Sequence, residues 1–310
     1  MTAPLDRIVG SPDLWGRLAA FLNLAEAAER SPHTIKTYKA IIRGFIHFVN
    51  ALGVVTPQDV TEEHIAAYII HKRKTCNGVS INTTYKHIRA WFNWMASPKR
   101  RIIEKSPLIG MDTPTLPKTV IKPLNGEQLQ QMLTHCADNI GGVRNKAIVL
   151  LTYDSGLRRS ELSGIKLADV DIKRGAIKVM GKGAKERYVA MGEETKKAIM
   201  QYLFMRSDTL PWLFVTHQEP QEQLKPNGIY INIKRLMRTA GITGVKTGPH
   251  TLRHSFATAS IRNGANLFDV QSLLGHSTLA MTRRYAATIN SEEAIQRHHS
   301  FSPADKLVQR

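Results

Sequence analysis

The chain has 310 residues, and its 43 Lys and Arg residues outnumber 25 Asp and Glu residues, which gives a net charge of +18. This charge favours a polyanion partner, most simply nucleic acid, although a soluble basic protein without such a partner is the alternative. No apolar run approaches the ~20 residues of a membrane span. Cys76 and Cys136 lie far apart without CxxC spacing, which excludes a disulfide framework and a structural zinc site and predicts a cytoplasmic chain.

Four amphipathic helices are predicted in the N-terminal third of the chain. The first spans residues 14–29. The second begins at Ser31 and Pro32, a good N-cap followed by a residue that suits the first helical position. The third begins near Thr61, where two acidic residues follow in the first turn, and the fourth is predicted to begin with Ser80 as its cap.

The second and fourth of these helices pair an aromatic-rich core face with a polar, basic face. Such a face is often simply solvated, so the pattern alone leaves open whether it contacts a polyanion. The residues of the two faces are Lys36, Lys39 and Arg43 on the second helix, and Asn82, Lys86 and Arg89 on the fourth.

A basic, proline-rich segment divides the chain. Residues 97–123 cannot form one helix, because proline removes a backbone donor and clashes with the preceding turn. We therefore predict a helical N-terminal domain at residues 1–111, a linker at residues 112–123 and a second domain at residues 124–310.

The second domain is predicted to combine helices with a small sheet. Its first helix begins at Asn125, which forms a capping box with Gln128, and a buried helix at residues 143–153 ends at Gly156. Three short strands follow, with the sequences DVDIK, AIKVM and ERYVAM. The predicted fold class is mainly α with a small antiparallel β-sheet in the C-terminal domain.

Further helices are predicted after the strands. Two of them cover residues 193–206 and 226–240, and the second carries the basic residues Lys234 and Arg235. The remaining helices begin at Pro249, at the cap Asn266 and at the cap Ser277, and glycines 264 and 275 end the first two of these.

Six side chains of the second domain suit the cleavage of a phosphodiester without a carboxylate cluster for a metal. Two arginines suit the charged non-bridging oxygens, because a guanidinium is planar and always charged. A lysine or histidine can protonate a leaving alkoxide, and a tyrosine can hold the broken end covalently. The six are Arg158, Lys182 (at the tip of the predicted hairpin), His250, Arg253, His276 and Tyr285.

The motifs that hold these residues resemble the signature of the tyrosine recombinases of the phage-integrase and Xer type. They are GLRRSEL, GKGAKERYV, HTLRH and LLGH, with Tyr285 nine residues after His276. The resemblance implies a helical, SAM-like core-binding domain followed by an α+β catalytic domain. It also implies a site-specific DNA recombinase or integrase that needs no metal, ATP or other cofactor.

The resemblance also assigns a role to each of the six residues. Tyr285 attacks the scissile phosphate and makes a 3′-phosphotyrosyl link, while the two arginines stabilise the transition state. Lys182 protonates the 5′ oxygen, His250 accepts the tyrosine proton, and His276 donates a hydrogen bond to the phosphate. Glu161 is predicted to hold the first arginine in place, or else to be an ordinary acid in the first turn of its helix.

The family further implies partners for the chain. These are double-stranded DNA recombination sites, with four protomers as a homo-tetramer on two duplexes, a nucleoid-associated location and a C-terminal segment that contacts a neighbouring protomer. The basic faces then become predicted DNA contacts, mostly to phosphates. The short stretch before the first helix predicts no separate arm-binding domain. His254 is predicted to support the active site. The predicted DNA contacts are Lys36, Lys39, Arg43, Lys86, Arg89, Lys234 and Arg235.

Two other functions are compatible with parts of this pattern. A type IB topoisomerase-like enzyme shares the chemistry, but the short chain, the separate helical domain and the GKGAKER hairpin favour a recombinase. A relative that has lost catalysis and only binds DNA is the second alternative. All six catalytic positions hold the expected residue, which argues against such a loss.

Overall fold

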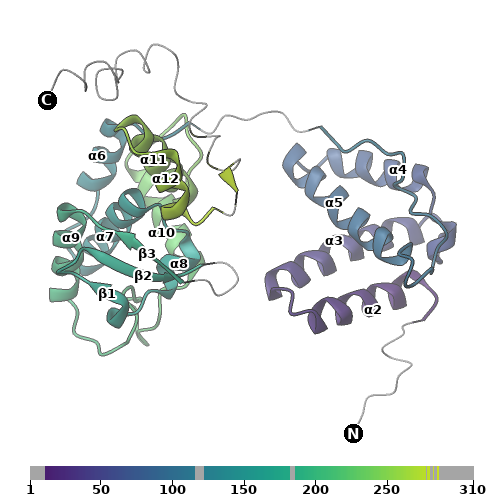
Figure 1. The fold of residues 1–310 in the computed structure, drawn as a ribbon, viewed down its shortest axis with the longest axis horizontal. Coiled ribbons are helices and arrows are strands. Elements are labelled where there is room, and N and C mark those ends of the chain that lie inside the picture. Colours follow the sequence, from purple (N-terminus) through teal and green to yellow (C-terminus); the bar gives the residue numbers. More distant parts are fainter. Residues whose placement is uncertain are drawn as a thin grey trace, which may run out of the picture. The chain divides into compact units, whose positions relative to one another are not determined.

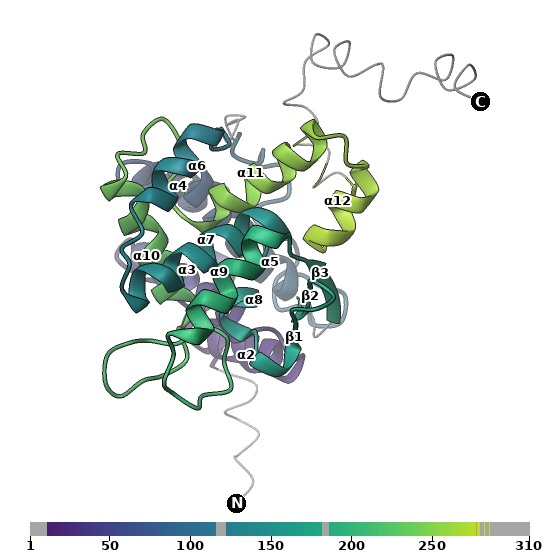
Figure 2. The same ribbon diagram turned by 90° about the vertical axis from the view of Figure 1, so that its left-hand side faces the viewer.

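A computed structural model of the chain describes residues 11–115, 122–181 and 186–276, together with residues 278, 279, 282 and 285. The chain divides into two compact units, residues 1–119 and residues 120–310, each with its own hydrophobic core. Figure 1 and Figure 2 show the elements of both units. The division falls inside the predicted linker at residues 112–123. Within the ranges that the structure describes, no helix is long and apolar enough to cross a membrane.

The described part of the first unit is helical, as predicted. Its helices are α2 (Leu14–Ala27), α3 (Pro32–Asn50), α4 (Glu62–Arg73) and α5 (Gly78–Met95), with a short 3₁₀ turn, η1 (Pro57–Asp59). Their apolar faces meet in a core of large side chains, because each helix repeats its apolar residues at helical spacing. Fully buried members of this core include Phe45, Ile88, Trp91 and Phe92.

The predicted cap of the fourth helix is wrong. Asn77, not Ser80, is the N-cap, and its side-chain oxygen accepts a hydrogen bond of 2.9 Å from the backbone N–H of Ser80. Glycine lowers helix propensity, which is why residue 78 suggested a loop, but an Asn cap offsets that penalty. The helix therefore begins at Gly78.

The basic faces of α3 and α5 are exposed, but the polar stripe of α5 is not uniform. Asn82 is buried, and its Nδ2 donates to the carbonyl of Pro114 at 3.0 Å. The hydroxyl of Tyr85 donates to the carbonyl of Met111 at 2.8 Å. The chain on both sides of the predicted start of the linker, at Met111 and Pro114, is therefore bound to α5.

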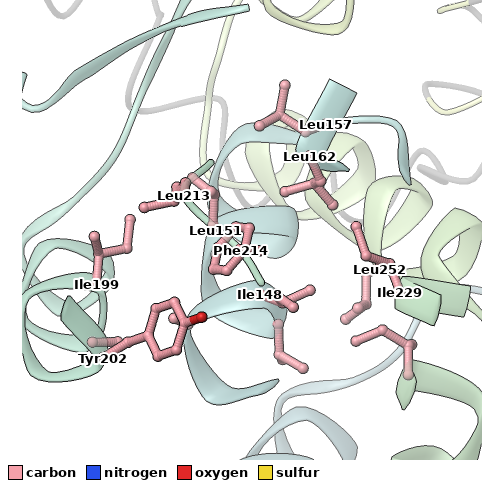
Figure 3. Close-up of a cluster of buried hydrophobic side chains, with 14 of the residues drawn as sticks. Ile148, Leu151, Leu157, Leu162, Ile199, Tyr202, Leu213, Phe214, Ile229 and Leu252 are labelled. Carbon is pink, nitrogen blue, oxygen red and sulfur yellow. The ribbon is translucent and has the colours of Figure 1, made fainter. Parts of the chain in front are cut away.

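The second unit is built around the buried helix α7 (Ile140–Ser155), which packs against α9 (Glu193–Phe204) and α11 (Pro249–Arg262). The other described helices are α6 (Gly126–Thr134), α8 (Arg159–Gly164), α10 (Pro226–Thr239) and α12 (Leu267–Leu274), with a 3₁₀ turn, η2 (Leu167–Asp169). Side chains from these helices fill the core shown in Figure 3, among them Ile148, Leu151 and Leu252. The capping box of Asn125 and Gln128 is confirmed.

The three predicted strands form one antiparallel sheet in the order β1-β2-β3. The strands are β1 (Val170–Asp171), β2 (Ala176–Met180) and β3 (Glu186–Ala190), and Val179 pairs with Arg187. Side chains alternate between the two faces of a strand. Arg187 therefore shares the inward face of β3 with the buried Val189. Lys182, predicted at the hairpin tip, lies outside the described residues.

A smaller apolar cluster joins α11 to α12. It contains Phe256 and Ile261 from α11, and Val270 and Leu274 from α12. Gly156, the left-handed residue that ends α7 (φ +62°), lies directly against it, and a Cβ at this position would clash with Phe256 and Leu274. Only glycine permits both this backbone conformation and this close approach. The C-terminal end of α7 is thereby brought beside the end of α12.

Candidate active site

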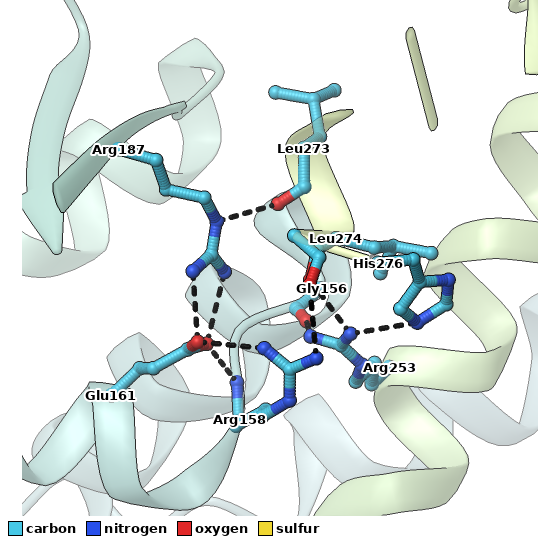
Figure 4. Close-up of polar contacts among 9 residues, drawn as sticks. Gly156, Arg158, Glu161, Arg187, Arg253, Leu273, Leu274 and His276 are labelled. Atoms are coloured by element: carbon cyan, nitrogen blue, oxygen red, sulfur yellow. Dashed lines mark hydrogen bonds and ion pairs between the residues drawn. The ribbon is translucent and has the colours of Figure 1, made fainter. Parts of the chain in front are cut away.

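Four of the six predicted catalytic residues lie where the ends of α7 and α12 meet α11. Arg158 is the N-cap residue of α8, and Arg253 lies in the middle of α11. His276 directly follows the left-handed Gly275 that ends α12, and Tyr285 follows nine residues later. Figure 4 shows the guanidinium groups of Arg158 and Arg253 at the end of α12, with the ring of His276 turned toward Arg253.

Arg253 is almost completely buried, with 5% of its surface exposed, and its donors are directed at backbone oxygens. Its Nη1 donates to the carbonyl of Gly156 at 2.5 Å, and its Nη2 donates to the carbonyl of Leu274 at 2.8 Å. Burial, together with the positive charge of Arg158, lowers the pKa of Arg253 to about 10. The guanidinium is therefore charged at neutral pH although little water surrounds it.

Arg158 is held by a carboxylate and a carbonyl and keeps 28% of its side chain exposed. Its Nη1 donates to Glu161 Oε1 at 2.9 Å, its backbone N–H donates to Glu161 Oε2 at 2.8 Å, and its Nη2 donates to the carbonyl of Gly275 at 3.3 Å. The contact predicted between Glu161 and Arg158 is thus present. An exposed guanidinium edge fixed in this way suits an incoming oxyanion.

Arg187 is a residue of this network that the sequence pattern did not single out. Both of its Nη atoms donate to Glu161, at 2.8 and 3.0 Å, and its Nε donates to the carbonyl of Leu273 at 3.0 Å. One feature of the sequence could have pointed to Arg187. Side chains of a strand alternate between its two faces, which places Arg187 on the inward face with Val189. An arginine pointing inward needs a buried acceptor, and Glu161 is that acceptor.

Three consecutive carbonyls at the end of α12 each accept a hydrogen bond from a different arginine. Leu273 accepts from Arg187, Leu274 accepts from Arg253, and Gly275 accepts from Arg158. The last carbonyls of a helix have no partner within it and carry partial negative charge. This helix end therefore orients three guanidinium groups without cancelling their charge.

His276 connects Arg253 to the segment that carries the predicted nucleophile. Its Nε2 lies 3.0 Å from Arg253 Nη2, and its Nδ1 lies 2.9 Å from the hydroxyl of Thr282. Since an arginine only donates, Nε2 accepts and Nδ1 carries the proton. The predicted donation from His276 to a phosphate requires the ring to gain a proton or to separate from Arg253.

Tyr285 lies between two histidines. Its ring is 4.9 Å from the ring of His254 and 6.0 Å from the ring of His276, nearly parallel to the latter at 14°. Its side chain is partly buried and packs against the cluster that joins α11 to α12. His254, predicted to support the site, is therefore in ring contact with the predicted nucleophile.

His250 lies on α11, at an exposed position one turn before Arg253. Neighbouring protein atoms displace part of the water around its ring, and three arginines (253, 159 and 158) lie close enough to repel a second positive charge. Both effects lower the pKa of His250 below its usual value of 6.5. The ring is therefore neutral at pH 7 and able to accept a proton.

The predicted DNA-contacting side chains of both units are on the surface. Lys36, Lys39, Arg43, Lys86, Arg89, Lys234 and Arg235 are all exposed. Tyr38 of α3 and His87 of α5 are in ring contact at 4.8 Å, so the two basic faces of the first unit belong to neighbouring helices. In the parts of the chain that the structure describes, no three His, Cys, Asp or Glu side chains are grouped so as to hold a metal ion.

Comparisons with known protein families place both units. A profile described as "Phage integrase family" matches residues 122–292, and one described as "Phage integrase, N-terminal SAM-like domain" matches residues 18–101. The chain is 36% identical over 221 residues to the tyrosine recombinase XerD of Proteus mirabilis, covering 68% of this chain and 69% of the relative. It is 33% identical over 261 residues to the tyrosine recombinase XerA of Thermococcus kodakarensis, covering 83% and 85%.

A solved structure with the same fold is that of the XerH site-specific recombinase bound to a palindromic difH substrate in a post-cleavage complex. The two chains are 19% identical, with a TM-score of 0.70 over 91% of this chain and 84% of that one. At this identity the likeness establishes the fold alone. It supports the predicted SAM-like first domain and mainly helical catalytic domain.

Proposed function

Because the chain belongs to the phage integrase family of tyrosine recombinases, we propose that it is a site-specific recombinase that cuts and rejoins double-stranded DNA. One observation carries this proposal. Arg158 and Arg253 converge at the end of α12, joined through His276 to the segment that holds Tyr285. Two fixed guanidinium groups beside a tyrosine supply what phosphoryl transfer to a hydroxyl requires: charge stabilisation and a nucleophile.

In the first step, the oxygen of Tyr285 attacks the scissile phosphorus, and the bond from phosphorus to the 5′ oxygen breaks. The phenol proton goes to the neutral ring of His250, and Lys182 donates a proton to the leaving 5′ oxygen. Arg158 and Arg253 stabilise the negative charge that builds up on the non-bridging oxygens. The products are a 3′-phosphotyrosyl link and a free 5′-hydroxyl.

The second step is the reverse reaction with a partner strand. The 5′-hydroxyl of that strand attacks the phosphotyrosyl phosphorus, the bond to Tyr285 breaks, and the phenol regains its proton. The covalent link conserves the energy of the original phosphodiester, so this scheme needs no metal ion and no nucleotide. Two such exchanges through a four-way junction, by four protomers on two duplexes, complete recombination.

Binding of the duplex rests on the exposed basic faces of the two units. The side chains of α3 and α5 in the first unit, and Lys234 and Arg235 of α10 in the second, contact phosphates and so position the protein on DNA. Within the described ranges, none of the predicted contacts on α3 and α5 forms an ion pair with a neighbouring acid. Their charges are therefore available to phosphates.

The test uses a nicked duplex that carries a candidate recombination site, because loss of the short cut fragment traps the covalent adduct. We expect an adduct on a denaturing gel with the wild-type protein, also in the presence of a chelator, and none with Tyr285→Phe. An adduct formed by Tyr285→Phe would show that another residue is the nucleophile. Cleavage abolished by the chelator would contradict the metal-free scheme.

The same preparation separates strand exchange from simple DNA relaxation. Two labelled duplexes with the same site are mixed, and recombinant products are separated by size. We expect recombinant duplexes, which a type IB topoisomerase-like enzyme does not make. Relaxation of supercoiled plasmid without recombinants would overturn the assignment as a recombinase. Binding without any adduct across a library of sites would indicate a relative that only holds DNA.

A further inference from the structure

Arg187 lies outside the six residues of the proposed mechanism, yet it is one of the most constrained side chains near them. Only 15% of its side chain is exposed. Its donors reach Glu161 on α8 and the carbonyl of Leu273 on α12, while its own backbone is part of β3. This one guanidinium therefore links β3, the helix α8 that Arg158 caps, and the end of α12.

The carboxylate of Glu161 is shared equally between two arginines. Its Oε1 accepts from the Nη1 atoms of Arg158 and Arg187, and its Oε2 accepts from the backbone N–H of Arg158 and the Nη2 of Arg187. Burial alone raises the pKa of Glu161, but the hydrogen bonds from Arg187 and Arg158 outweigh it, and the pKa is lowered. Glu161 is therefore a fixed, buried anion.

Because Glu161 is shared with Arg187, Arg158 keeps N–H donors that a substrate can use. A carboxylate facing a single arginine takes two parallel hydrogen bonds from its guanidinium. Here Arg187 takes the two-pronged contact, and Arg158 gives only one side-chain bond to Glu161. The rest of the Arg158 guanidinium remains directed at Gly275 and toward solvent.

Gly275 is the second residue that orients the side chain of Arg158. A Cβ built at this residue would lie 3.2 Å from Cζ, Nε and Nη1 of Arg187, so the guanidinium occupies the space that a side chain at Gly275 would need. The carbonyl of the same residue accepts from Arg158. Arg187 thus lies against both groups that orient the Arg158 side chain: it donates to the carboxylate of Glu161 (Figure 4), and it lies beside Gly275.

We propose that Arg187 is a positioning residue for DNA cleavage, which aims the guanidinium of Arg158 at the scissile phosphate by fixing Glu161 and the end of α12. The inference rests on the proposed function, since it concerns the same active site. Arg187 does not touch the phosphate, and its effect passes through Arg158. Without Arg187, Glu161 and the end of α12 lose the contacts that fix them, so the guanidinium of Arg158 loses its aim.

The test measures single-turnover formation of the covalent adduct on the nicked duplex. We expect Arg187→Met to slow cleavage on the order of 100-fold, as for other small misplacements of a catalytic group. Arg187→Lys keeps the charge but lacks the two-pronged contact, so we expect a similar loss. The double variant R158M/R187M should be no slower than R158M, because both changes remove one function. The matched control is Arg174→Met, an exposed arginine between β1 and β2, with unchanged cleavage.

A second substrate separates positioning from a general defect in folding. In a duplex with a neutral methylphosphonate at the scissile position, one charged oxygen is absent, and the aim of Arg158 matters less. We expect the losses caused by R187K and R158K to shrink together on this substrate. Equal losses of R187K on both substrates, or multiplicative losses of R158M and R187M, would overturn the inference. Absence of any wild-type adduct would instead refute the proposed function.

A second variant keeps the test valid if Arg187→Met fails to fold. Arg187→Met leaves the buried carboxylate of Glu161 with half of its partners, which can destabilise the second unit. The pair E161Q/R187M removes the buried carboxylate together with the arginine that paired with it, so no anion is left short of partners. We expect this pair to fold and still to cleave as slowly as R187M, because Arg158 has lost its fixed acceptor. Wild-type cleavage by the folded pair would contradict the positioning role.

Discussion

The basic side chains of the first unit and the arginines of the active site use their charges in opposite ways. Lys39 and Arg43 on α3 are exposed, without an ion pair to any described residue, and in the proposed function they attract phosphates over a distance. Arg253 is 5% exposed, and its donors are fixed on backbone carbonyls and on His276. The proposal therefore assigns DNA affinity to the exposed charges and stabilisation of the transition state to the fixed ones.

The acceptors in the active site explain how it stays positively charged after burial. Arg158, Arg187 and Arg253 are oriented by three carbonyls of α12 and by one carboxylate, that of Glu161. A carbonyl orients a guanidinium through its dipole and leaves the full charge in place. A site built from three Arg–Glu pairs would be neutral and would gain little from a phosphate. Four predictions sharpen this contrast.

The largest effect is expected from Arg253→Lys. Lysine keeps the charge but cannot reach Gly156 and Leu274 together, so a fixed donor to the transition state is lost. We expect single-turnover cleavage to fall about 10²- to 10³-fold, the usual cost of removing one such donor. The salt dependence of DNA binding should change by less than about one unit of slope. A large change in that slope with unchanged cleavage would place Arg253 among the binding residues.

The next effect is in the pH dependence of cleavage. The pKa of His250 lies below 6.5 because of lost hydration and neighbouring arginines, so the neutral ring predominates as the pH falls from 8 to 6.5. We expect an even cleavage rate over this range, then about a tenfold loss per pH unit below the pKa of the folded protein. His250→Gln should be slow and lack this acid limb, whereas His135→Gln, at an exposed position, should keep it. An acid limb above pH 6.5 would argue against His250 as the proton acceptor.

A smaller effect is expected when the exposed charges of the first unit are removed, and it concerns DNA binding rather than cleavage. The pair Lys39→Gln/Arg43→Gln removes two exposed charges from α3, so the slope of log affinity against log salt should decrease by about 1.8. Adduct formation at saturating protein should not change. The control pair Arg73→Gln/Lys74→Gln, at the end of α4, removes the same charge outside the predicted faces. A slope that Lys39→Gln/Arg43→Gln leaves unchanged would show that α3 does not lie on DNA.

Much of the fold was predictable because the relevant signals are local. The capping box at Asn125 and the left-handed glycines at 156 and 275 fix helix ends within a few residues. The three strands were recognised from their change of period to two residues. Asn77 was missed because a glycine follows it, and propensity then competes with capping.

The site was predictable only in part, because motifs identify residues but not their partners. The roles of the six residues remain predictions, although four of them lie in one contact network. Glu161 was expected to hold Arg158, and it does so, but no sequence pattern showed that Arg187 shares it. That contact joins residues 26 positions apart, from a strand and a helix. Local periodicity predicts the face of Arg187, and only the tertiary fold supplies its acceptor.

The smallest predicted effect tests the helix that carries Lys86 and Arg89, independently of any DNA. Asn77→Ala removes the hydrogen bond to the N–H of Ser80, so we expect the free energy of unfolding of the first unit to fall by about 1 kcal/mol. Ser80→Ala should change it by less than about 0.5 kcal/mol. Urea unfolding is followed by tryptophan fluorescence, because three of the four tryptophans, Trp15, Trp91 and Trp94, lie in this unit, and a W212F background removes the signal of the second unit. The reverse ranking would restore Ser80 as the cap and shift the start of α5.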